Sequence, residues 1–243
     1  MLKYTEVVNR KIKQSIQNQV EKFEKASNKL AEAVKQDGIL HVLGSGHSHI
    51  LAEEIFYRAG GPVFVNPILD SSIMLHEGPI KSTQVERLPG YAKVLLDNVD
   101  IKKHDICLIV SNSGRNALPI EAAYYMRERG IFTISISSFK HSQSVSSRHK
   151  SGKRLFEITD LSFDNYGEIG DAALSVPASE QKYGPTSSIV GIAIVQTLIS
   201  MTIEKLVERG EDPDIIRSAN LDGSDEINNL LIDKYKSRIP LLR

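Results

Sequence analysis

The stretch that decides the fold is residues 39–48, which read Ile39-Leu40-His41-Val42-Leu43-Gly44-Ser45-Gly46-His47-Ser48. A short apolar run stops at a Ser/Gly turn, and Ser48–Arg58 then has the composition of a helix that ends at Ala59-Gly60-Gly61-Pro62. An apolar run followed by a glycine turn and a helical pattern is typical of a strand–loop–helix unit. The sequence therefore predicts a β-strand whose carboxyl end carries a polar loop.

The same alternation of short apolar runs and helical patterns continues along the chain. Strands alternating with helices at this spacing predict an α/β fold, a three-layer, doubly wound parallel sheet with helices on both faces. The further predicted strands are Val63–Val65, Asp105–Val110 and Ile131–Ile136, with later candidates at Phe156–Ile158 and Ala173–Val176; the further predicted helices are Glu86–Asp97, interrupted by Pro89-Gly90, then Leu118–Arg129 and Ser187–Arg209.

The two ends of the chain predict helical additions to this sheet. Apolar residues recur mostly at four-residue steps between Val8 and Val34, which predicts one long helix over residues 1–37 that stops at Asp37-Gly38. Its apolar stripe needs a partner, either the body of the domain or another subunit. We expect a single domain over residues 1–243, with the sheet core at 38–209 and a helical tail at 210–243.

The composition excludes several classes of protein. Lys+Arg and Asp+Glu both total 30, and a net charge near zero argues against a nucleic-acid-binding protein. The first residues lack the apolar segment of a secretory signal, and the longest apolar run, Ile189–Val195, is too short to cross a bilayer. The single cysteine, Cys107, excludes a disulfide within the chain and a cysteine metal cluster. We therefore expect a cytoplasmic protein with no nucleic-acid or membrane partner.

A second Ser/Gly loop, Ser111-Asn112-Ser113-Gly114-Arg115-Asn116, follows the predicted strand Asp105–Val110. Glycine lets an anion approach the backbone N–H groups, a helix N-terminus adds unpaired donors, and serine hydroxyls bind phosphate oxygens. The carboxyl ends of parallel strands share one edge of the sheet, so the two loops together predict a phosphate site. The alternative is that each turn only connects a strand to a helix, with serine as its cap.

The loops lack two signatures of nucleotide-binding proteins. The first loop has no third glycine of the Gly-x-Gly-x-x-Gly pattern, and no Gly-Lys-Ser/Thr occurs in the chain. These absences favour a phosphorylated sugar over a nucleotide as the ligand of the loops.

With its paired loops in strand–loop–helix context, the chain resembles the sugar isomerase (SIS) domain family from about Leu30 to Arg209. The run His149–Leu155, then Asp164-Asn165 and Gly170-Asp171-Ala172, is similar to a SIS subgroup whose members are named as phosphosugar or phosphoheptose isomerases. The resemblance implies a flavodoxin-like SIS topology and a homodimer or homotetramer, often with a site completed across the interface. We expect no metal and no cofactor.

The resemblance also implies which residues hold the substrate. In the family, a Ser-x-Ser-Gly-x-Ser/Thr pattern wraps the phosphate; Ser111 and Ser113 match it, and Asn116 stands where Ser or Thr is usual. The family also brings the turn before the last long helix to the substrate. The predicted substrate-binding residues are Gly44, Ser45, Gly46, Ser48, Ser111, Asn112, Ser113, Gly114, Arg115, Asn116, Thr186 and Ser187.

Aldose–ketose isomerisation needs a base that moves a proton between adjacent carbons and an acid that serves the oxygens. Glu53 and Glu54 follow the first loop on its helix, although the relatives place a catalytic Glu a few residues further along; the alternative is a solvated helix face paired with Arg58. Glu86 lies in the segment where etherase relatives carry a second catalytic Glu, with Glu77 as a competitor or an ion pair as the alternative.

His47 and His149 are the predicted acids, the first inside the first loop and the second in a Ser/Lys-rich loop that would reach over the site as a lid. His47 and His49 flank Ser48, but two histidines without a carboxylate cluster are weak evidence for a metal.

Three functions fit these residues. A phosphosugar isomerase is favoured, although phosphoheptose isomerases use a His on the last long helix and Ser187–Arg209 contains none. An amino-sugar-phosphate etherase or lyase is closely related. A non-catalytic phosphosugar sensor is the third, but residues 1–37 are too few for the separate DNA-binding domain that such regulators carry.

Overall fold

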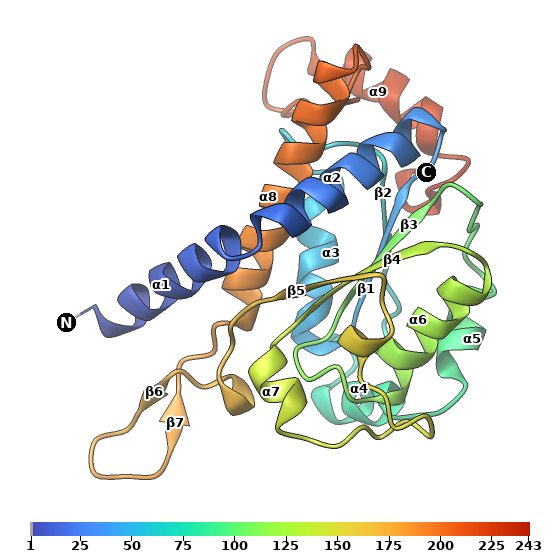
Figure 1. The fold of residues 1–243 in the computed structure, drawn as a ribbon. Helices are drawn as coiled ribbons and strands as arrows, with labels where there is room; N and C mark the ends of the chain where they lie inside the picture. Colours follow the sequence, from blue (N-terminus) through green and yellow to red (C-terminus); the bar gives the residue numbers. More distant parts are fainter. Residues whose placement is uncertain (1) are drawn as a thin grey trace.

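The computed structural model describes residues 2–243 and contains a central parallel sheet (Figure 1). Its five strands are β1 (Leu40–Gly44), β2 (Val65–Ile68), β3 (Ile106–Val110), β4 (Phe132–Ser137) and β5 (Leu161–Asp164). They lie in the order β2-β1-β3-β4-β5, which is the flavodoxin-like doubly wound order. The predicted fold class is confirmed.

Helices cover both faces of the sheet. The long helix α8 (Ser187–Glu208), the N-terminal helices and α3 (Ile50–Ile55) pack on one face; α5 (Tyr91–Leu96) and α6 (Ala117–Glu128) pack on the other, with α4 (Pro79–Glu86) beside α6. The strands β1 and β3 are buried along their whole length because both of their faces are covered. A ligand can therefore reach these central strands only at their ends.

The N-terminal region forms two helices, α1 (Lys3–Gln17) and α2 (Val20–Lys35), so the prediction of one continuous helix was wrong. The chain bends at Gln19, whose buried side chain donates to the Asp164 carbonyl and accepts from the Asp164 N–H, both at 2.8 Å. These two bonds tie the bend to the end of β5. Beyond it, α1 projects from the body of the molecule (Figure 1).

One predicted later strand was wrong, and the other forms outside the main sheet. Phe156–Ile158 lies in a 3₁₀ turn, η2 (Leu155–Glu157), and the fifth strand of the sheet follows it at Leu161–Asp164. Ala173–Val176 contains β6 (Leu174–Ser175), which pairs only with β7 (Lys182–Tyr183) in a hairpin that projects from the body (Figure 1). The predicted helix Glu86–Asp97 is two helices, since α4 ends at Glu86 and α5 begins after Gly90.

The remaining elements are short, apart from one helix in the tail. They are η1 (Gly46–His49), α7 (Phe139–Gln143), η3 (Ile169–Asp171), α9 (Ser224–Tyr235) and η4 (Pro240–Leu242). By length and composition α8 alone among the helices of residues 2–243 is apolar enough to cross a membrane. In this fold it packs against α1, α2 and α3, and a side chain at Gly191 would meet Leu51 at 2.7 Å. The apolar character of α8 is that of a core helix.

Candidate functional site

The two Ser/Gly loops leave the sheet side by side, because Gly44 at the end of β1 pairs with Val110 at the end of β3. A side chain at Gly44 would lie 2.5 Å from the backbone of Ser48, so only glycine allows the first loop to turn back this tightly. A small cavity lies where the loops meet. Its polar walls come from both loops, the end of β5 and the start of α8, namely Ser48, Asn112, Asn165, Ser187 and Ser188.

The second loop presents unpaired backbone donors at the N-terminus of α6. The N–H groups of Asn112, Ser113, Arg115 and Asn116 have no hydrogen-bond acceptor within residues 2–243, whereas the Gly114 N–H donates to Ser111 Oγ at 3.2 Å. Gly114 has a positive φ of 57°, the left-handed conformation that occurs in anion-binding backbone turns. Unpaired amides at the N-terminus of a helix favour an anionic ligand.

Three arginines surround this loop. Arg148 donates to Asn116 Oδ1 at 2.8 Å; its burial and the charges of Arg115 and Arg87 lower the pKa of Arg148, while Glu86 raises it. Within residues 2–243 no carboxylate lies within 4 Å of any of the three guanidinium groups. The region therefore carries unneutralised positive charge. The sequence analysis missed Arg87 and Arg148, for which the only signal was the Ser/His/Lys-rich composition of the loop that contains Arg148.

The predicted substrate-binding side chains differ in whether they already make hydrogen bonds within the chain. The side chains of Ser45, Ser48 and Ser113 make no hydrogen bond within the described part of the chain, and Ser188, which was not predicted, is equally free. By contrast, Asn112 Oδ1 accepts from Asn165 Nδ2 at 2.9 Å. Arg115 turns aside, since its Nε donates to the Ser146 carbonyl.

The N-terminus of α8 already holds a carboxylate. Asp171 accepts hydrogen bonds from the Thr186 and Ser187 N–H groups, both at 3.0 Å, and from the Ser187 hydroxyl at 2.5 Å. Both residues were predicted to donate to the substrate, and the structure gives these donors to Asp171 instead. The hydroxyl of Ser188, one residue further on, remains available.

The predicted acidic residues lie around the cavity but do not line it. Glu53 is 3.4 Å from His49 Nε2, and Glu54 accepts from Arg58 and Gln196, both at 3.1 Å. Glu86 ends α4 close enough to Arg148 to affect its pKa, which places this carboxylate beside the second loop.

The competitor Glu77 bonds to Lys81 and Ser71, and these hydrogen bonds lower the pKa of Glu77. Its carboxylate is thus held in a local exposed cluster rather than at the loops.

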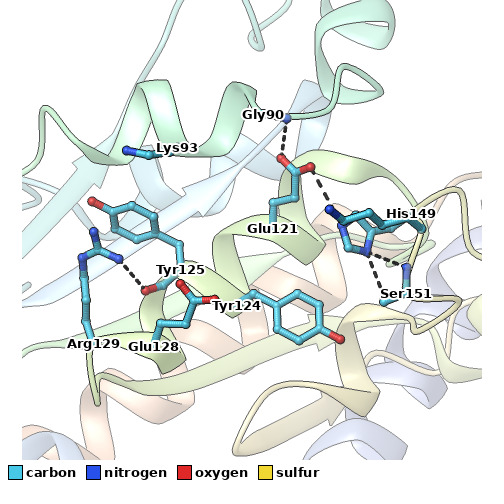
Figure 2. Close-up of a pocket in the computed structure, with 10 residues that line it drawn as sticks. Gly90, Lys93, Glu121, Tyr124, Tyr125, Glu128, Arg129, His149 and Ser151 are labelled. Atoms are coloured by element: carbon cyan, nitrogen blue, oxygen red, sulfur yellow. Dashed lines mark hydrogen bonds and ion pairs between the residues drawn. The ribbon is translucent and has the colours of Figure 1, made fainter.

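The histidines divide between two places. His47 is exposed at the tip of the first loop, whereas His49 is buried and contacts the Gly46 carbonyl. His149 lines a different and much larger cavity of about 610 Å³ between α5, α6 and its own loop, where its Nε2 lies 3.9 Å from Glu121 (Figure 2). The structure therefore does not bring His149 to the two Ser/Gly loops.

Residues 3–138 match the family described as SIS domain. The chain belongs to the SIS domain family. This membership confirms the resemblance. The SIS chain is also 41% identical over 240 residues to a UPF0309 protein of Geobacillus sp. (strain WCH70), covering 99% of this chain and 97% of that protein. It is 42% identical to a UPF0309 protein of Halalkalibacterium halodurans, covering 93% of this chain and 91% of that protein.

Two solved structures share the fold of this SIS chain. A phosphoheptose isomerase from Francisella tularensis superposes with a TM-score of 0.53 at 13% identity, covering 83% of this chain and 95% of that chain. A phosphoheptose isomerase from Neisseria gonorrhoeae gives a TM-score of 0.51 at 15% identity, covering 82% of this chain and 92% of that chain. At these identities the likeness concerns the fold.

Proposed function

We propose that this SIS protein binds a phosphorylated sugar, with the phosphate on the second loop, and converts it between its aldose and ketose forms. One observation carries the proposal: four backbone N–H groups of the second loop, just before α6 begins, have no acceptor within residues 2–243. Buried or partly buried backbone donors rarely stay unpaired, so this arrangement favours an anionic ligand that the amides would bind.

The side chains around the second loop fit a phosphate of two negative charges. The free hydroxyl of Ser113 adds a donor, and Arg148 and Arg115 add positive charge with no carboxylate within 4 Å in residues 2–243, Glu86 being the acidic residue whose charge acts on Arg148. Bidentate arginine–phosphate pairs are among the stronger hydrogen bonds in proteins. The sugar would lie across the mouth of the small cavity, where Ser48 and Ser188 offer free hydroxyls.

The proton transfers need one base and one acid. In the proposed reaction the base removes the proton from the carbon next to the carbonyl, and an enediol forms as the carbonyl oxygen is protonated. The same base then returns the proton to the former carbonyl carbon, while the deprotonated acid takes the proton from the hydroxyl of the adjacent carbon, which becomes the new carbonyl. Glu86, beside Arg148, is the proposed base, and His47 at the tip of the first loop is the proposed acid. Glu53 with its neighbour His49 is the alternative pair.

A non-catalytic phosphosugar sensor is the second candidate. No ionisable side chain lines the small cavity, whose walls are apolar or neutral polar residues. This favours binding without turnover, unless a second subunit supplies the missing group. An etherase or lyase would need the same acid and base as the isomerase and is separated from it only by the product.

A homodimer or homotetramer belongs to the same proposal. The helix α1 and the β6–β7 hairpin both project from the body (Figure 1), and Val20, Tyr183 and Ile189 are large apolar residues that stay exposed. These features fit contact with a second copy. Size-exclusion chromatography with light scattering tests it, and a strict monomer at micromolar concentration would rule out a shared site.

A thermal-shift panel of aldose and ketose phosphates tests binding, and NMR of each stabilising compound tests turnover. A ligand at a hundred times its dissociation constant stabilises the fold by about 2.7 kcal/mol. We expect Ser113→Ala to reduce this stabilisation and Glu86→Gln to keep binding but abolish conversion. Glu226→Gln, an exposed carboxylate on α9, is the matched control and should change neither.

Two outcomes decide between the candidate functions. Binding without conversion that Glu86→Gln, Glu53→Gln and Glu54→Gln leave unchanged would favour the sensor. The absence of stabilisation by every sugar phosphate would refute the proposal as a whole.

A further inference from the structure

A large cavity lies on the face of the sheet that α5 and α6 cover, away from the cavity between the two Ser/Gly loops. It measures about 610 Å³, within the range of sites for small organic ligands. Figure 2 shows its side chains, which come from α6, from the start of α5 and from the loop of residues 149–151. Neither the SIS family match nor the proposed sugar-phosphate site assigns it a role.

A carboxylate with an unused acceptor lies at one end of this cavity. Glu121 Oε2 accepts from the Gly90 N–H at 2.8 Å, but Oε1 is 3.9 Å from His149 Nε2, too far for a hydrogen bond. His149 Nδ1 accepts from the Ser151 N–H at 3.2 Å, which leaves the hydrogen of the neutral ring on Nε2, facing the gap. An acceptor and a donor therefore stand side by side in the 3.9 Å contact that Figure 2 marks, without a hydrogen bond between them.

Aromatic rings and cations form the rest of the cavity. The half-buried ring of Tyr124 lies 5.9 Å from that of His149, so both offer surface to a flat ligand. Arg129 stacks over the Tyr125 ring at 3.4 Å. Lys150 has no carboxylate within 4 Å in residues 2–243 and is available to an anion, whereas the Arg129 guanidinium also donates to the Tyr125 carbonyl at 3.2 Å. Glu128 is a second carboxylate of the cavity.

The geometry points to a nucleotide as the ligand of this cavity. Its base would stack on Tyr124 and give an exocyclic amino hydrogen to Glu121 Oε1, and its phosphate would bind Lys150, on the loop that carries His149. Stacking on an aromatic ring, a carboxylate for an amino group and free cations for a phosphate are the means by which proteins hold nucleotides. The phosphate-loop signatures absent from the sequence belong to other nucleotide folds and are not needed here.

This site also communicates with the second Ser/Gly loop, a statement that rests on the proposed function. The neighbour of His149 is Arg148, whose N–H donates to the Arg115 carbonyl at 2.8 Å and whose guanidinium holds Asn116. Leu155, at the far end of the same segment, donates to the Gly114 carbonyl. A nucleotide that moves His149 must therefore shift the loop that binds the phosphate of the sugar. By linkage, each ligand changes the affinity of the other by the same factor.

Isothermal titration calorimetry with GMP, AMP, CMP and UMP tests the site without any sugar phosphate. We expect the three nucleotides that carry an amino group to bind more tightly than UMP, and Glu121→Gln to abolish that preference. Tyr124→Leu should weaken binding at least about fivefold, because stacking on an aromatic ring contributes that much per base. Lys150→Gln, on an exposed loop, should weaken it as well, and Tyr57→Leu, at an exposed tyrosine outside this cavity, is the control.

Inorganic phosphate and ribose 5-phosphate separate this site from the Ser/Gly loops. Binding of all four nucleotides no better than inorganic phosphate, or binding that Ser113→Ala removes while Tyr124→Leu and Lys150→Gln do not, overturns the site. A sugar-phosphate thermal shift that saturating nucleotide leaves unchanged overturns the communication. The absence of any sugar-phosphate shift without nucleotide would refute the proposed function instead.

Discussion

Removal of the Glu168 charge tests how the projecting helix α1 is held on the domain. Lys11 has a side chain only 5% exposed, and its Nζ donates to Glu168 Oε1 at 2.8 Å and to the Tyr166 carbonyl at 2.6 Å. Glu168 also binds Lys140, which is well exposed. The substitution Glu168→Gln keeps the shape of the side chain and removes its charge.

The magnitude follows from the pKa of Glu168. Hydrogen bonds from Lys11 and Lys140 lower this pKa from 4.5 to about 2. If the pair were shielded from water, such a lowering would correspond to about 3 kcal/mol. The Glu168 side chain is 33% exposed, so solvent screening reduces the expected contribution to about 1–2 kcal/mol. Because the folded state lowers the pKa, this stabilisation is present above pH 4.5 and is lost as the pH falls from there toward 2.

Urea denaturation followed by circular dichroism at several pH values measures the effect. At pH 7 we expect Glu168→Gln to lower the free energy of unfolding by about 1–2 kcal/mol, and the difference from wild type to shrink as the pH falls below 4.5. Lys140→Met, which removes the exposed partner of Glu168, is the matched control and should lower the free energy of unfolding by less than Lys11→Met does. Equal stability of Glu168→Gln and wild type at pH 7, or a difference at pH 3 as large as that at pH 7, would refute the reasoning.

Three further perturbations follow from the structure. Gly114→Ala puts a methyl group at a positive φ and 3.1 Å from the Leu155 side chain. We therefore expect the free energy of unfolding, measured by urea denaturation, to fall by about 1–2 kcal/mol, and sugar phosphates to bind more weakly. Gly152→Ala, at a positive φ in open space, should lower the free energy of unfolding by less. Burial, and then the charge of Arg115, lowers the pKa of His141, so the folded state favours the neutral ring. The stability of the fold that depends on the neutral ring is complete above pH 6.5 and is lost as the pH falls through the lowered pKa. An NMR titration midpoint of His141 at or above 6.5 would contradict this. Asp171→Asn removes the charge that caps α8 and should cost about 1 kcal/mol, measured by thermal unfolding; unchanged stability would show that the cap is dispensable.

The strands that could be predicted are those with strong local patterns. Ile39–Leu43 and Asp105–Val110 are apolar except for His41 and Asp105, because β1 and β3 are buried on both faces. The edge strand β5 alternates apolar and polar residues over only four positions, and the equally short alternation Phe156-Glu157-Ile158, which overlaps η2, was mistaken for a strand. A pattern this short does not separate a strand from a turn of 3₁₀ helix.

In the candidate site, too, the sequence indicated only the features that have a local pattern. The Ser/Gly loops were found because glycine and serine at the ends of strands have a local physical meaning. Arg148 was missed because its role depends on contact with Asn116, 32 residues away, and nothing local to either residue indicates that contact. The hydrogen bond of the Ser187 hydroxyl could not be predicted for the same reason, since the carboxylate that accepts it belongs to Asp171 in another segment.

The sequence by itself determined the α/β class, the positions of the central strands and the two loops at their carboxyl ends, because apolar periodicity and glycine turns act within a few residues. Only the tertiary structure decided which donors remain free, that three arginines gather at the second loop, that Gln19 breaks the first helix and that His149 faces a separate cavity. Each of these depends on side chains that meet across the fold, because a donor or acceptor that already bonds to a neighbour is not available to a ligand. Whether a serine or histidine has hydrogen bonds left for a ligand depends on which neighbours the fold places beside it.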